Sequence, residues 1–210
     1  MAKTSSTYPM SLSIDYPDRK LNRLTTFFRP FMAIPIAIIL GLIIGAVFSW
    51  KEGGWSYQYT TAGLVVLPTV LMLLFRQKYP RWWFDWNLAL TRFCTRVSAY
   101  FALLRDEYPS TDEEQAVHID IPYPNAKREL NRWLPLVKWI MAIPHYIVLF
   151  FLYIAVCVAV IVAWFAILFT GSYPKSLFDF VVGVFQWSLR VSVYAFLLTT
   201  DRYPPFRFSG

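Results

Sequence analysis

Few residues of this chain have the types and spacing that catalysis or metal binding requires. His118 and His145 lie more than twenty residues apart, and Cys94 and Cys157 sit in apolar runs without a partner at metal-ligand spacing. A lone histidine in an apolar run could relay protons or bind a metal, but a locally hydrogen-bonded helix end is the simpler interpretation. The cysteines are expected to be small buried hydrophobic residues. The sequence contains no protease triad signature, H-E-x-x-H, P-loop, G-x-G-x-x-G or C-x-x-C motif, so we expect no catalytic residue, metal or cofactor.

The best site candidates are two polar stripes. The segments 82–104 and 176–198 each carry residues spaced by four, three and four positions, which share one face of a helix. The stripes are Asp85, Ala89, Arg92 and Arg96, and Asp179, Gly183, Gln186 and Arg190. Because arginine binds phosphate through two hydrogen bonds, such stripes could clamp lipid headgroups or line a polar groove. The plainer interpretation, which we favour, is an ion pair that joins two parts of the molecule.

The elements that carry these residues occur twice. L-N-R-L-T-T-F-F-R-P-F-M-A-I-P (21–35) resembles L-N-R-W-L-P-L-V-K-W-I-M-A-I-P (130–144) at an offset of 109, and R-V-S-A-Y (96–100) resembles R-V-S-V-Y (190–194) at an offset of 94. We predict a tandem duplication, with a first repeat at 1–108, an acidic linker at 109–115 and a second repeat at 116–210. An alternating stretch near the start of each repeat predicts a short strand.

The composition indicates a membrane protein. Of the 210 residues, 57% are hydrophobic and 16% are charged, and the net charge is +7. Typical soluble domains have about 45–50% apolar and about 25% charged residues. So much apolar mass excludes a disordered chain, and two cysteines exclude a disulfide scaffold. No secretory signal opens the sequence, so we expect internal segments to insert it.

Each half carries a long apolar run. The run 139–169 has no charge, and as one straight helix it would extend about 46 Å, whereas the hydrocarbon core is about 30 Å thick. In the first half a polar loop at 51–60 interrupts the run. We therefore predict an apolar helical hairpin in each half, with a single long helix over 139–169 as the alternative. The predicted fold class is an all-α membrane protein of two tandem repeats, each with a short strand, an apolar hairpin and an amphipathic helix that is interfacial or lines a groove.

Basic residues flank the apolar runs. The predicted basic membrane flanks are Arg23, Arg29, Arg132 and Lys138. By the positive-inside rule, these flanks and both termini face the cytoplasm at the bacterial inner membrane, and the loop 51–60 lies outside. The flanks could bind anionic lipids at about 1 kcal/mol per charge, or only set the topology. We expect no nucleic-acid binding, because the charge follows the membrane flanks.

The second half resembles a known family. The strings K-W-I-M-A-I-P-H-Y, L-F-D-F-V-V-G-V and R-V-S-V-Y-A-F-L-L-T-T-D-R-Y-P-P-F are similar to a bacterial membrane family, domain of unknown function 4389, over 117–206. The first half looks like a diverged copy, with Ile36 where the second has His145. The resemblance implies a small integral membrane module and brings no catalytic residues.

Three functions remain open from the sequence. We expect a non-catalytic accessory or organising subunit of a larger membrane assembly, with anionic lipids and other membrane proteins as partners. A small transporter or channel would instead need a polar path between the repeats. A membrane-shaping, lipid-binding protein would use its hairpins and interfacial helices as wedges in one leaflet.

Overall fold

The described part of the chain is mostly helical, as predicted. This computed structural model describes residues 8–17, 20–36, 38, 40, 46–51, 54–59, 62–111, 113 and 115–208. In chain order the elements are β1 (Ser11–Ile14), α1 (Arg23–Met32), β2 (Ala46–Lys51), β3 (Gly54–Tyr59), α3 (Ala62–Leu71), the π-helix η1 (Met72–Arg76), α4 (Arg81–Phe101), β4 (Val117–Asp120), α5 (Ala126–Glu129), α6 (Leu134–Met141), α7 (Ile143–Thr170) and α8 (Lys175–Ala195). Two small antiparallel sheets, β1–β4 and β2–β3, complete the described structure.

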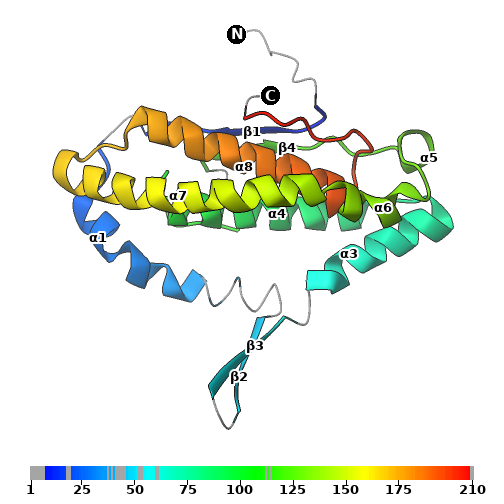
Figure 1. Cartoon of the computed structure of the whole chain (residues 1–210), viewed down its shortest axis with the longest axis horizontal. Coiled ribbons are helices and arrows are strands. Elements are labelled where there is room, and N and C mark those ends of the chain that lie inside the picture. Colours follow the sequence, from blue (N-terminus) through cyan, green and yellow to red (C-terminus); the bar gives the residue numbers. More distant parts are fainter. Residues whose placement is uncertain are drawn as a thin grey trace.

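The long helices α4, α7 and α8 form one layer (Figure 1). The β1–β4 sheet lies on one side of this layer, and α1, α3 and the β2–β3 hairpin lie on the other. In the sheet, Ser11 lies opposite Asp120 and Ile14 lies opposite Val117. One face of both strands is buried and the other is exposed and polar, which explains the alternating sequence pattern.

The predicted hairpin over 139–169 is wrong, because the alternative of one long helix is what forms. α7 starts beside Pro144, whose missing N–H is harmless in a first turn. No glycine or proline then follows until Gly171, which ends α7 in the left-handed conformation (φ 77°). The 28 residues of α7 extend about 42 Å.

The apolar run of the first half is interrupted by strands rather than by a polar loop. β2 and β3 pair as a hairpin with Lys51 opposite Gly54, while residues 52, 53 and 60 of the predicted loop at 51–60 lie outside the described residues. α1 and α3 lie at opposite ends of the molecule (Figure 1), so they do not pack against each other as a closed helical hairpin.

Both halves contribute to one hydrophobic core. It contains Leu12 and Leu104 from the first half together with Ile167, Val184 and Leu198 from the second. α7 packs on α8 and on α1, while β1 contacts α8 and β4 contacts α4. The predicted amphipathic segments are confirmed as helices α4 and α8, and these two helices support the sheet.

Two helices of the described part, α7 and α8, are long and apolar enough to cross a membrane. Only 22% of the most apolar window of α7 is buried inside the protein, against 50% for α8. An apolar helix of 28 residues that is mostly exposed is rarely left in contact with water. Length, composition and exposure together support association with a membrane.

Candidate functional site: ion-pair clusters, polar stripes and basic flanks

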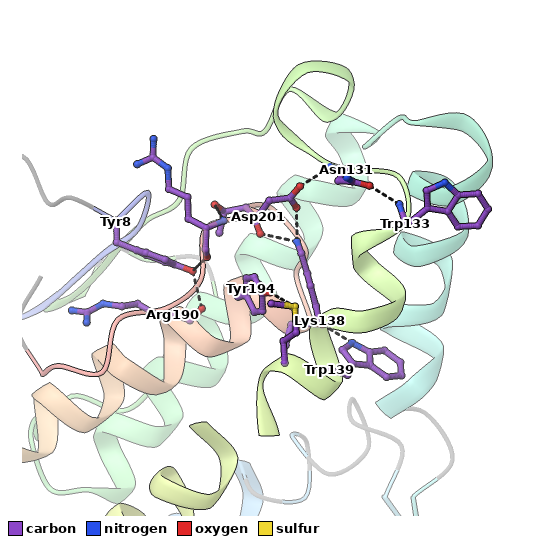
Figure 2. A network of polar contacts seen from close by, with 12 residues as sticks. Tyr8, Asn131, Trp133, Lys138, Trp139, Arg190, Tyr194 and Asp201 are labelled. Carbon is purple, nitrogen blue, oxygen red and sulfur yellow. Dashed lines mark hydrogen bonds and ion pairs between the residues drawn. The ribbon is translucent and has the colours of Figure 1, made fainter. Parts of the chain in front are cut away.

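A buried ion pair joins α6 to the segment that follows α8 (Figure 2). Lys138 is completely buried, and its Nζ lies 2.8 Å from Asp201 Oδ1 and 2.7 Å from the carbonyl oxygen of Thr200. The same Nζ lies 5.0 Å from the ring centroid of Tyr194. Asn131 donates its backbone N–H to the other Asp201 oxygen. Burial lowers the pKa of Lys138 below its ordinary value, and the bond to Asp201 offsets only part of this effect.

The same cluster occurs a second time, at α1. Arg29 is 2% exposed, forms an ion pair with Asp106, and lies 4.7 Å from the ring centroid of Tyr100. Asn22 donates its backbone N–H to Asp106 at 2.9 Å, and its side chain accepts from the N–H of Leu24. Arg29 and Asn22 precede Lys138 and Asn131 by 109 positions, which is the offset of the predicted repeat. The aspartates were missed by the sequence analysis, although both stand two residues before a Tyr-Pro pair.

Two exposed arginines reach across the halves to the ends of helices. Arg23 donates to the carbonyl oxygen of Phe169 at 3.1 Å, at the end of α7. Arg132 donates to the carbonyl oxygen of Phe75 at 2.9 Å, at the end of η1. Helix ends have carbonyl groups without helical partners, and a cation there also suits the helix dipole. Each arginine thus caps a helix of the other half.

The expected headgroup role needs correction for two of the four basic flanks. Arg29 and Lys138 are buried in ion pairs, so their side chains are not available to headgroups. The apolar residues next to Arg29 and Lys138 in sequence do not predict this burial, because the partner aspartates lie more than sixty residues away in sequence. Arg23 and Arg132 are exposed, but both are engaged at helix ends.

The arginines of the polar stripes bind carbonyl oxygens of the segments that cover α4 and α8. Arg92 donates to Ile119 on β4 at 3.1 Å, and Arg96 donates to Ser110 at 3.0 Å. Arg190 is completely buried and donates to Arg207 at 2.9 Å. In the same stripe a Cβ at Gly183 would lie only 2.9 Å from Phe208 Cβ, so the C-terminal segment passes directly over this glycine.

The acidic residues of the stripes do not pair with these arginines. Asp85 and Asp179 are exposed and Gln186 is partly buried. Among the residues that the structure describes, the ion pairs are Arg29–Asp106, Arg105–Glu107, His118–Asp15 and Lys138–Asp201. The stripes therefore do not form the Asp–Arg ion pairs that we favoured.

His145 is part of the core. Its Nδ1 accepts a hydrogen bond from Trp187 Nε1 at 3.1 Å, and its ring stacks on Phe206 with centroids 4.0 Å apart. Ile36 and Phe93 form the corresponding apolar contact in the first half. Within the described ranges, no group of three or more histidine, cysteine or acidic residues could hold a metal.

The cysteines are less buried than expected. Cys94 is half-buried and Cys157 is exposed, and both thiols are free. Cys94 lies on α4 and Cys157 lies on α7. The expectation of buried cysteines is therefore wrong for Cys157.

Part of the second half of the chain matches a known family. Residues 133–208 match the family model described as Domain of unknown function (DUF4389). No curated protein and no solved structure matches the chain. The matched segment runs from the start of α6 through α7 and α8, and it contains Lys138, His145, Arg190 and Asp201. Residues 133–208 are therefore similar to this family, whose function is unknown.

Proposed function

We propose that the chain is a non-catalytic membrane protein whose helices α4, α7 and α8 lie in the plane of the bacterial inner membrane, on its cytoplasmic side. In this orientation the β1–β4 sheet and the ion-pair clusters face water, and α1 and α3 enter the bilayer. The protein acts as an accessory or organising subunit that contacts anionic lipids and other membrane proteins.

The position of the β1–β4 sheet is the main support for this proposal. β4 packs against α4, and Arg92, near the middle of that helix, holds the carbonyl oxygen of Ile119. His118 and Asp120, on either side of Ile119, are exposed. If α4 crossed the bilayer, these polar side chains and the open sheet edges would lie at mid-depth, where irregular polar backbone exposed to lipid does not occur.

The distribution of basic residues supports the same orientation. Arg23 lies at the C-terminal end of α7, whereas Lys138 precedes the N-terminal end. A spanning α7 would put basic clusters on both sides of the membrane, against the positive-inside rule. A helix in the membrane plane keeps both clusters on one side. Exposed basic residues available to anionic headgroups at the two ends are Lys20 and Lys175, and Arg76, Lys78, Lys127 and Arg128.

A tandem duplication is part of this proposal. The repeated ion-pair clusters and the reciprocal arginine caps support two halves related by a pseudo-twofold axis. Tyr16 donates to the carbonyl oxygen of Tyr173, and Tyr123 donates to that of Tyr79, which is a further exchanged pair. Such an axis along the membrane normal gives both halves the same orientation in the membrane.

The transporter alternative has less support. Its polar path would need the charged stripe residues to face a cavity between the halves. Arg96 and Arg190 instead bind loop and tail carbonyl oxygens. A cavity between α4, α7 and α8 has no charged residue among its described lining residues.

Thiol labelling tests the orientation. In a background with Cys94→Ser and Cys157→Ser, single cysteines replace Lys127, before α6, and Ser176, after α7. His118→Cys marks the exposed face of β4. A membrane-impermeant maleimide should label all three positions in inverted inner-membrane vesicles and none in intact spheroplasts.

Labelling of Lys127→Cys and Ser176→Cys from opposite sides would overturn the proposal. Native mass spectrometry after mild detergent extraction then tests the organising role. We expect bound protein partners and enrichment of phosphatidylglycerol over phosphatidylethanolamine. A lone monomer without partners would contradict this role.

A further inference from the structure

An open cavity of about 900 Å³ lies between α4, α7 and α8. It contains Cys94 and Ser98 from α4, Cys157 from α7, and Ser188 and Ser192 from α8. Ser98 and Ser192 lie 94 positions apart, so corresponding residues of the two halves line the same cavity. Its volume is in the upper part of the range for ligand pockets, which is about 300–1,000 Å³.

The cavity faces away from the β1–β4 sheet. Arg92 donates to β4 of the sheet, and Arg96 donates to the segment that precedes β4. Cys94 lies two positions after Arg92, and Ser98 lies two positions after Arg96. Two residues correspond to about 200° around a helix, so the cavity side of α4 is opposite its sheet side. With the proposed orientation, the cavity therefore opens toward the hydrocarbon of the bilayer.

Most hydroxyl groups of the lining are already hydrogen-bonded inside the protein. Thr91, Thr95 and Ser98 each donate to the carbonyl oxygen four residues earlier in α4, at 2.8–2.9 Å. The hydroxyl of Tyr153 donates to Ser188 at 2.7 Å. The walls therefore present methyl groups, methylenes and rings, and such a surface holds water poorly.

The mouth of the cavity is also apolar. Phe101, Ile161 and Phe196 belong to its lining and are 44%, 58% and 45% exposed. A polar ligand would find no charged partner in the described lining, and no hydroxyl of α4 whose hydrogen bond is left unmade. The chemistry that fits is an unbranched hydrocarbon chain without polar groups.

We propose that the cavity binds an acyl chain of a phospholipid from the surrounding leaflet. The proposal rests on the membrane orientation proposed above, because that orientation supplies the chain. The headgroup of this lipid lies outside the cavity, because no charged residue among the described lining could receive it.

Photo-crosslinking tests the proposal. The complete protein is reconstituted in vesicles of phosphatidylethanolamine and phosphatidylglycerol that contain a phospholipid with a diazirine on its acyl chain. After irradiation, mass spectrometry of peptides maps the attachment sites. In the wild type we expect crosslinks to the cavity walls at 91–98 of α4 and 188–192 of α8, in addition to the exposed face of α7.

A matched pair of variants separates the cavity from the outer surface. Cys157→Trp fills the cavity, whereas Val158→Trp adds the same ring on the exposed face of α7, where Val158 is 57% exposed. We expect Cys157→Trp to lower crosslinking at the α4 and α8 walls by about tenfold, equivalent to about 1.4 kcal/mol of binding. Val158→Trp should leave the wall crosslinks unchanged.

The outcomes distinguish the two proposals. Crosslinks on the exposed face of α7 without wall crosslinks in the wild type would overturn the cavity proposal and leave the membrane orientation intact. Crosslinks at neither place would overturn both. Equal wall crosslinking in Cys157→Trp and the wild type would also contradict an acyl chain in this cavity.

Discussion

Lys138 and Asp201 give the sharpest prediction at the scale of single residues. Asp201→Asn leaves the completely buried Lys138 ammonium without its carboxylate, whereas Lys138→Met leaves an aspartate whose side chain is 21% exposed. Breaking a buried ion pair costs about 3–5 kcal/mol. We expect Asp201→Asn to lie near the upper end of this range and Lys138→Met near the lower end, measured by chemical unfolding in detergent.

A double-mutant cycle controls this prediction. In Lys138→Met/Asp201→Asn neither residue is charged, so the cost of the double variant should be clearly smaller than the sum of the single costs. If the two costs add, the charges do not interact and the assignment of this pair is wrong.

The hydrogen bond between Trp187 and His145 gives a second prediction. His145→Ile removes the acceptor of the buried Trp187 N–H and should cost about 1–3 kcal/mol of unfolding free energy. His145→Ile/Trp187→Phe recreates the apolar pair of Ile36 and Phe93 in the first half. Thermal unfolding should show that the double variant recovers part of the loss. A double variant less stable than His145→Ile would contradict the correspondence of these positions.

Sequence reasoning located these residues but not their partners. The repeated motif identifies Lys138 and Arg29 as corresponding positions, and it places them beside apolar runs. It assigns them to the membrane surface because a local pattern contains no information about residues far along the chain. Burial with Asp201 and Asp106 depends on tertiary contacts across at least sixty positions.

At the scale of elements, the end of α7 depends on Gly171. This residue has φ 77°, and its carbonyl oxygen accepts the N–H of Leu21 at 2.9 Å. There is room for a Cβ, so Gly171→Ala should cost about 1 kcal/mol through backbone strain alone. Unfolding in detergent measures this cost. A neutral Gly171→Ala would show that the left-handed end is not required.

The element that the sequence analysis predicted incorrectly is also α7. The mismatch between a 31-residue apolar run and the bilayer thickness favoured a turn, but that argument holds only for a helix that crosses the bilayer. A helix in the membrane plane has no such limit, and the run contains no residue that would end it before Gly171. Local periodicity correctly predicted the strands β1 and β4 and the amphipathic helices α4 and α8.

At the scale of the whole molecule, the proposed function depends on the direction of α7 relative to the membrane. A 28-residue helix with apolar side chains along its length is compatible with both directions by composition alone. The sheet across the middle of α4 and the basic residues at both ends of α7 favour the membrane plane. The two halves then face the same compartment, as the repeated basic flanks predict.

Depth measurement along α7 distinguishes a helix in the membrane plane from one that crosses the bilayer. Ile147, Val158 and Phe169 are exposed and lie eleven residues apart, which keeps them on one face of the helix. Each is replaced by a spin-labelled cysteine in the background without native cysteines, and the relative accessibility to oxygen and to a polar nickel complex gives its depth. We predict the same depth for all three labels. A deep central label between two shallow ones, across the roughly 33 Å that separates the outer two, would show that α7 crosses the bilayer and would contradict this prediction.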